Sequence, residues 1–455
     1  MKTTRRLFIR NLSLATAATV VPARFLRSCT GNNHFKEKEA PALIVDIDFN
    51  DEVIIRPGQM TEQDVEELVH GLHDNGVDII LVRMGYLGYL PYHTDLSYPV
   101  GFDEEHARRY PFTKDSQFFE KWMKERAEHN KRYNEVLKTF NPPEVFIRVG
   151  HELGMKVIMW IDLFDDMYSG HRSKFIDNHP HCQWTARDGE TYFNGIISYA
   201  WEEARAFRVT QAIELLDLGA DGIHCSTSAH ARHLPNVQEN DFYGFEKPIV
   251  DEYMKRFGID ITRDDSFDRD EWHTIKGEFM NHLYRELAEV CHQRGKELWI
   301  GLQLGDYTNL SADPHFSTNV VARYRNLWKE LVTDSIADAF IIGDYELCSQ
   351  PNHPYWSAKE LAPPPGPDLF SWAADYYQEF CKNKTKLYLF GEWLAHAEPD
   401  IDKQLTEWAE RVLANGFDGI DIHEAANFEN PSTKMRLLRR MKNRLQGREV
   451  DFLVY

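Results

Sequence analysis

The chain has 455 residues, of which 42% are hydrophobic and 13% aromatic, and its formal net charge at pH 7 is −20. This length and composition allow a large core, arranged either as two or three domains or as one barrel of alternating strands and helices. The acidic charge is spread along the chain and repels phosphate backbones, which argues against nucleic acid as a partner.

The first 30 residues predict an export signal. The pair "RR" at 5–6 precedes a short stretch rich in Ala and Thr, which ends at "VPA" (21–23), a sequence with the small residues of a cleavage site. This order is similar to twin-arginine signals and predicts a periplasmic or secreted protein, with an ordinary Sec signal as the alternative. The apolar stretch is too short to remain as a transmembrane segment. Lipid anchoring at Cys29 is a weaker alternative, because two arginines interrupt the apolar run before it.

A half-repeat of amphipathic helix, glycine break and apolar strand runs through residues 41–455. It is clearest in "HDNGVDIILVR", "HELGMKVIMWID", "LDLGADGIHCS", "HQRGKELWIGLQ" and "LANGFDGIDIHE", where Gly stands at the left-handed cap between helix and strand. The predicted strands are 42–49, 78–84, 156–164, 221–227, 297–304, 338–346, 386–393 and 418–424. The clearest predicted helices are 61–76, 201–219, 270–295 and 401–416, and a basic helix closes the chain.

Apolar strands that are each followed by a helix predict a parallel sheet covered on both faces. Eight such units predict a single (β/α)8 TIM barrel over residues 41–455. A doubly wound sheet is the rival, but the first strand is followed by "NDEVIIRPG", which is no Gly-rich phosphate loop. Long insertions are expected after strands two, four and six (85–140, 228–268 and 347–370), on the face where barrel enzymes build their sites.

The six cysteines are scattered and form no C-x-x-C pair. This spacing predicts neither a disulfide framework nor a structural zinc site.

Polar residues stand where the predicted strands end. Because side chains alternate along a strand, these residues are expected to point into the barrel mouth. A ring of ionisable groups at one mouth is costly to bury unless it has a function. The ring consists of Asp46, Asp48, Arg83, Trp160, Asp162, His224, Gln303, Asp344, Glu346, Glu392, Asp421 and His423.

Carboxylates dominate this ring, and hydrolysis of a glycosidic bond needs two of them, one as the acid and one as the nucleophile or base. Crowding of like charges raises the pKa of one carboxyl group, which suits it to be the acid. Trp160, Trp393 and Tyr345 are expected to stack on sugar faces. The remaining predicted substrate-binding residues are Asp48, Arg83, His224, Gln303, Asp421 and His423.

The strand ends, together with "YGFEKPIVDEYMKRFGID" (243–260) and "GADGIH" (219–224), resemble the glycoside-hydrolase-like TIM barrels found in secreted bacterial proteins. The resemblance covers nearly the whole mature chain and implies a barrel that acts on a poly- or oligosaccharide. Amylase-like barrels carry a catalytic Asp at the end of strand four, where this chain has Ser226. The largest clan of retaining barrel glycosidases has an Asn-Glu pair there and a Glu at the end of strand seven; only the second is matched, by Glu392.

The sequence therefore predicts Glu392 as nucleophile or base and Glu346 as general acid, with Asp162 and Asp344 tuning the pKa or holding substrate. No cofactor is predicted in this mechanism. One alternative is a metal-dependent sugar isomerase or hydrolase, with a divalent ion on Asp46, Asp48, His224, Glu346 and His423. The other is a carbohydrate-binding barrel that has lost catalysis, which Ser226 favours.

Overall fold

The computed structural model describes residues 40–448, except 87, 102, 110, 112–115, 165, 168–169, 228–240, 303–323, 343–368, 393–400, 424 and 426–430. The described residues belong to one compact unit, Ala40–Tyr455. Within them, no helix combines the length and apolarity needed to cross a membrane.

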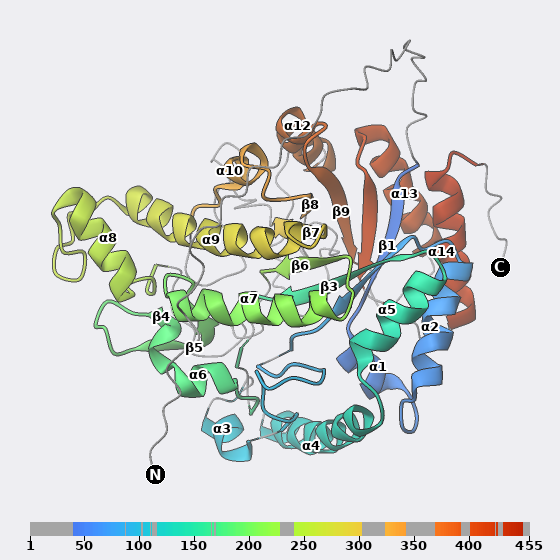
Figure 1. Ribbon diagram of the computed structural model, residues 1–455, viewed down its shortest axis with the longest axis horizontal. Coiled ribbons are helices and arrows are strands. Elements are labelled where there is room, and N and C mark those ends of the chain that lie inside the picture. The colour runs from blue at the N-terminus through green and yellow to red at the C-terminus, as the bar shows by residue number, and fades with distance from the viewer. Residues whose placement is uncertain are drawn as a thin grey trace, which may run out of the picture. The chain divides into compact units, whose positions relative to one another are not determined.

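In this part of the chain, eight parallel strands close into a barrel in the order β1-β10-β9-β8-β7-β6-β3-β2, which confirms the predicted TIM barrel (Figure 1). Each lies within a predicted strand and most end a residue or two earlier. Their bounds are β1 Ala42–Ile47, β2 Ile79–Arg83, β3 Lys156–Asp162, β6 Gly222–Ser226, β7 Glu297–Leu302, β8 Ala339–Ile342, β9 Lys386–Glu392 and β10 Gly419–His423.

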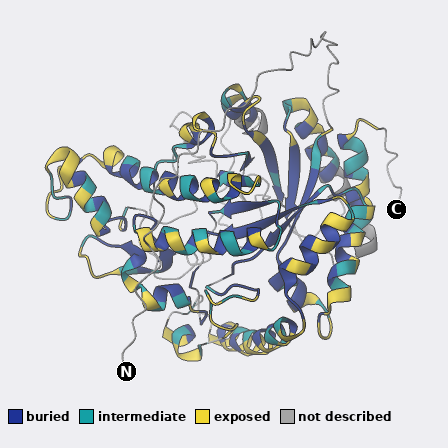
Figure 2. Ribbon diagram, viewed as in Figure 1, coloured by how far each residue is buried: buried dark blue, intermediate teal, exposed yellow. Residues whose placement is uncertain are grey.

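Helices follow the strands, and apart from those in the long insertions they cover the outside of the barrel, with their buried faces toward the strands and their exposed faces outward (Figure 2). After β1 to β3 these are α1 Phe49–Ile55, α2 Glu62–Asp74, α3 Glu104–Arg109, α4 Ser116–Thr139, α5 Pro142–Glu152 and α7 Glu202–Asp217. After β6 to β10 they are α8 Lys247–Phe257, α9 Arg269–His292, α10 Trp328–Thr333, α12 Leu369–Cys381, α13 Ile401–Asn415 and α14 Pro431–Leu445.

The alternation of side chains divides the strands between two cores. Val45 and Ile420 belong to the large cluster between strands and helices. Ile44, Ile158 and Trp299 belong to a second cluster that fills the barrel lumen. The polar residues continue the lumen face toward the carboxyl ends of the strands, so the mouth lies directly above an apolar plug.

The five predicted glycine caps all have the left-handed backbone that the prediction requires. The φ angles are 89° at Gly76, 76° at Gly154, 111° at Gly219, 67° at Gly295 and 70° at Gly416. L-residues are strained in this region, which is why glycine marks these five passages from helix to strand, although Ser335 (φ 56°) and Asn383 (φ 62°) adopt it at two others.

The insertions differ in part from the prediction. Those after β2 and β6, the second and fourth barrel strands, are present and carry α3, α4 and α8, whereas the one expected after β8 lies outside the described residues. An insertion after β3 was not predicted. It holds α6 Lys174–Asn178, the 3-10 helix η1 Pro180–Cys182 and a hairpin of β4 Gln183–Thr185 and β5 Tyr192–Ile197. The Asp188-Gly189 dipeptide at the hairpin turn, with φ of 74° at Gly189, is the signal that was available.

Two glycine substitutions separate backbone strain from steric overlap. Gly295→Ala places a Cβ in open space at φ 67° and is expected to lower the free energy of unfolding by about 1–2 kcal/mol. Gly222→Ala places a Cβ 2.4 Å from the carbonyl oxygen of Glu297 on the neighbouring strand and is expected to cost about 3 kcal/mol. Urea unfolding of both variants checks the order; an equal or smaller loss in Gly222→Ala would contradict this strand spacing.

Candidate functional site

The predicted polar residues that the structure describes are all buried at the carboxyl ends of the barrel strands. Their exposed fractions run from 2% at Asp46, Asp162 and Asp421 to 7% at His224 and His423. Asp48, Arg83 and Trp160 fall between these values.

Gln303, Asp344, Glu346 and Trp393 lie outside the described residues, as does the side chain of Glu392. The backbone of Glu392 is described, and in β9 it pairs in register with His423 of β10. In β8 the lumen side chains are Ala339 and Ile341, and Phe340 and Ile342 pack outward. The alternation within that strand therefore gives no support to the inward orientation expected for residues 344 and 346.

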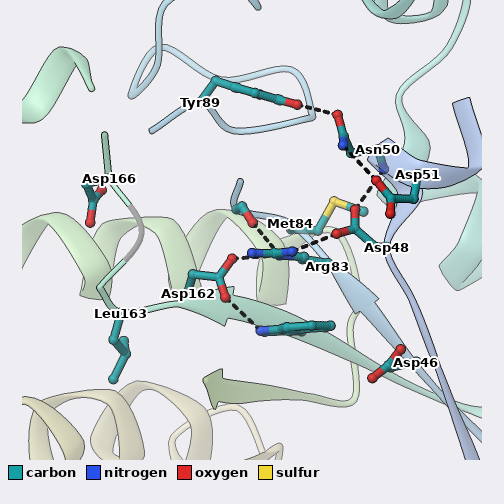
Figure 3. A network of polar contacts seen from close by, with 12 residues as sticks. Asp46, Asp48, Asn50, Asp51, Arg83, Met84, Tyr89, Asp162, Leu163 and Asp166 are labelled. Carbon is teal, nitrogen blue, oxygen red and sulfur yellow. Dashed lines mark hydrogen bonds and ion pairs between the residues drawn. The ribbon is translucent and has the colours of Figure 1, made fainter. Parts of the chain in front are cut away.

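Arg83 lies between two carboxylates at the mouth, as Figure 3 shows. Its Nη1 donates to Asp48 Oδ2 at 2.6 Å, and its Nε donates to Asp162 Oδ2 at 2.7 Å. The second oxygen of Asp162 accepts a hydrogen bond from Trp160 Nε1 at 3.0 Å. The guanidinium also lies over the Trp160 ring, 4.9 Å from its centroid. Asp162 therefore has both oxygens engaged within the protein, which fits a substrate-holding or supporting residue better than a proton donor.

Asp48 connects this ion pair to the first helix. Its Oδ1 accepts a hydrogen bond from the backbone N–H of Asn50 at 3.0 Å and so caps α1. The ion pair thus fixes the ends of β1, β2 and β3 relative to one another. Removing one member of a buried ion pair leaves an uncompensated buried charge, which costs about 3–5 kcal/mol.

A second cluster, formed by Asp46, Asp421 and His423, lies at the ends of β1 and β10. The Nδ1 of His423 is 2.8 Å from Oδ2 and 2.9 Å from Oδ1 of Asp46. Burial raises the pKa of Asp46, and His423 lowers it in part. Burial and then the charge of Asp46 raise the pKa of Asp421 well above its ordinary value. Asp421 Oδ1 has no hydrogen-bond partner among the described residues, so this cluster holds a carboxyl group with a raised pKa and an oxygen open to a further hydrogen bond.

His224 and Trp160 complete the described half of the mouth. Burial lowers the pKa of His224 to about 3, so its imidazole is neutral at physiological pH. Its Nδ1 is buried and has no partner among the described residues. The Trp160 ring lies edge-on to both His224 and His423, at 6.2 Å from each ring centroid. Neutral imidazole groups both donate and accept hydrogen bonds, which suits them to sugar hydroxyls.

Residues of α7 support the mouth from outside, and sequence reasoning missed them. Arg208 donates to Asp166 and, at 3.4 Å, to the carbonyl oxygen of Leu163, which follows Asp162. Gln211 Nε2 donates to the carbonyl oxygen of Met84, the residue after Arg83, at 2.9 Å. Both side chains are at most 2% exposed. Polar residues within an amphipathic helix ordinarily indicate its solvent face, so no local signal identified these two.

The described members of the alternative metal site do not come together as ligands. Among the described residues, three ligand atoms lie within 4.8 Å of one another at one place only, His181, Cys182 and Glu203, far along the chain from Asp46 and Asp48.

The sequence matches no family model and no curated protein. The glycoside hydrolase domain of PgaB (BpsB) from Bordetella bronchiseptica has a similar structure, with a TM-score of 0.50 at 14% identity over 88% of this chain and 99% of that one. A polyextremophilic beta-galactosidase from the Antarctic haloarchaeon Halorubrum lacusprofundi gives a TM-score of 0.51 at 9% identity, over 89% of this chain and 58% of that one. At these identities the likeness shows the fold, a TIM barrel shared with glycoside hydrolases.

Replacing Arg83 tests the ion pair at the mouth. Arg83→Met leaves Asp48 and Asp162 buried without their counter-charge and is expected to lower the free energy of unfolding by about 3–5 kcal/mol at pH 7. Lowering the pH should recover part of this loss, because the two carboxyl groups can then remain buried in the protonated form. Arg148→Met is the matched control, since Arg148 also bridges two carboxylates, Glu62 and Glu66, but is 43% exposed. Its loss should stay below about 1 kcal/mol, and equal losses in the two variants would contradict the role given to Arg83.

The raised pKa of Asp421 predicts how stability depends on pH. The folded state binds a proton more tightly than the unfolded state, so this contribution to stability is present at acid pH and is lost as the pH rises through the folded pKa. Asp421→Asn mimics the protonated form and should remove a slope of up to about 1.4 kcal/mol per pH unit. Urea unfolding between acid and alkaline pH measures this slope, and an unchanged slope in the variant would exclude Asp421 as its source.

Proposed function

We propose that the protein is an exported glycoside hydrolase that cleaves a poly- or oligosaccharide with two carboxyl groups at the barrel mouth. The observation that carries this proposal is the cluster of Asp46, Asp421 and His423, in which His423 contacts Asp46 and burial raises the pKa of the Asp421 carboxyl group well above its ordinary value. Glycosidic hydrolysis needs such a proton donor and a second, ionised carboxylate close by. The TIM barrel shared with glycoside hydrolases supports the same reaction class, and the twin-arginine-like sequence at 1–30 supports export.

Glu392 is assigned as nucleophile or base, as the sequence predicts. Its backbone is in register with His423, so it ends its strand beside the cluster of Asp46, Asp421 and His423. Glu346 is the proton donor predicted from the sequence, with Asp344 beside it. Asp421 is a second candidate for that role, because its pKa is raised and one of its oxygens has no partner among the described residues.

Substrate hydroxyls are assigned to the neutral side chains of the mouth. His224 offers a neutral imidazole with Nδ1 unpartnered among the described residues. Trp160 offers an aromatic ring beside it, and the ion pair of Arg83 with Asp48 stabilises this side of the mouth. Gln303, Trp393 and His423 are assigned to the same role from the sequence.

A carbohydrate-binding barrel without catalysis is the second candidate. It is favoured by the end of β6, where Ser226 pairs in register with Asp162, and by the engagement of Asp162 and Asp48 with Arg83. On that side of the mouth no described carboxylate is available for chemistry. Tight sugar binding without cleavage across a broad glycan panel would support this candidate over hydrolysis.

Conservative substitutions distinguish the carboxyl groups. The variant Glu392→Gln should lower kcat by about 10²–10⁴-fold while the protein stays folded. The same loss is expected in one of the two acid variants, Glu346→Gln or Asp421→Asn, namely the one that removes the proton donor. The acid variant should also lose the alkaline limb of the kcat/KM profile, which shows which of the two candidates supplies the proton. Glu152→Gln, on the exposed face of α5, is the control and should retain full activity. Undiminished hydrolysis in Glu392→Gln, or in both acid variants, would overturn the assignment.

A further inference from the structure

The insertion after β3 brings together three side chains of different chemistry. His181 and Cys182 belong to η1, and Glu203 lies in the first turn of α7. One ligand atom from each, an imidazole nitrogen, the thiol sulfur and a carboxylate oxygen, lies within 4.8 Å of the others. Cys182 is fully buried, whereas His181 and Glu203 are exposed. The trio therefore has a protein floor and an open outer side.

The spacing of the two donor atoms in η1 is that of a tetrahedral metal site. Cys182 Sγ and His181 Nε2 are 3.5 Å apart. A tetrahedral zinc ion with bonds of about 2.3 Å to sulfur and 2.0–2.1 Å to nitrogen holds those two atoms about 3.5 Å apart. A thiolate together with an imidazole is a donor set that selects zinc-like ions over magnesium or calcium.

The surrounding residues hold these side chains in place and supply negative charge that favours a bound cation. The His181 ring packs edge-on against Trp201 at 4.9 Å, which fixes the plane of the imidazole. The carbonyl oxygen of Cys182 accepts the backbone N–H of Ser198 at 2.7 Å, which ties η1 to the chain just before α7. The amino end of α7 carries a partial positive charge that opposes a cation. Two carboxylates, Glu202 and Glu203, lie in that first turn and counter it.

We propose that His181, Cys182 and Glu203 form a binding site for a divalent transition-metal ion of the zinc class. The three side chains supply three ligands, and water completes the coordination on the open side. The bound ion joins η1 to the start of α7 and fixes the insertion on the barrel. Neither the spacing of these residues in the chain nor the isolated cysteine predicts this site from sequence, because the trio matches no zinc motif.

Cobalt titration of the purified, chelator-treated protein tests the proposal. Co²⁺ alone should bind with one-to-one stoichiometry and give the near-ultraviolet sulfur-to-cobalt charge-transfer band of a thiolate ligand, and Zn²⁺ should displace it. Cys182→Ser should abolish the band, and His181→Gln and Glu203→Gln should each weaken binding at least about tenfold. Zn²⁺ should also raise the unfolding temperature of the wild type but not of Cys182→Ser.

Neighbouring residues of the same type serve as matched controls. His179→Gln and Glu202→Gln change a nearby imidazole and a nearby carboxylate outside the trio, and both should keep the wild-type affinity. The exposed variants His181→Gln and Glu203→Gln carry the test even where Cys182→Ser folds poorly. Absence of the charge-transfer band in the wild type, or equal affinities in the trio and control variants, would overturn the site.

Discussion

The buried ion pair of Arg83 with Asp48 and Asp162 is the constraint on which the barrel mouth depends. One guanidinium compensates two carboxylates that are at most 3% exposed, and it does so across the ends of three neighbouring strands. In a chain with a net charge of −20, the pairing with Arg83 decides which acidic groups of the mouth remain available to contact a ligand. Arg83 engages both Asp48 and Asp162, so the described carboxyl groups of the mouth that it does not engage are those of the neighbouring cluster, Asp46 and Asp421.

The neighbouring cluster of Asp46, Asp421 and His423, at the ends of β1 and β10, is organised by the opposite principle. Asp46 and Asp421 share the imidazole of His423, and burial raises the pKa of both carboxyl groups, although His423 and, for Asp46, Arg83 lower it in part. His224, on β6 next to β3, is kept neutral by burial alone. The mouth thus combines two carboxylates that are paired with a guanidinium and two carboxyl groups whose pKa is raised, together with the neutral imidazole of His224.

The sequence predicted what depends on local geometry. Gly76, Gly154, Gly219, Gly295 and Gly416 mark caps because their φ angles favour glycine, and strand alternation placed Asp46, Arg83, Asp162, His224 and Asp421 at the mouth. It did not predict partners, since His423 and Asp46 are 377 positions apart and only closure of the barrel brings them together. Alternation within β8 gives no support to the assignment of residues 344 and 346, because Ala339 and Ile341 are its lumen side chains and the strand ends at Ile342, before them.

Helix α7 connects the mouth to the proposed metal site. Its first turn carries Glu203, and its second and third turns carry Arg208 and Gln211, which bind the carbonyl oxygens of Leu163 and Met84. Those two residues directly follow Asp162 and Arg83, the partners in the central ion pair (Figure 3). A metal ion that fixes the start of α7 would therefore also restrict the backbone that positions Asp162 and Arg83. The insertion after β3 is in this sense part of the support of the site, although none of its side chains belongs to the ring of polar residues at the mouth.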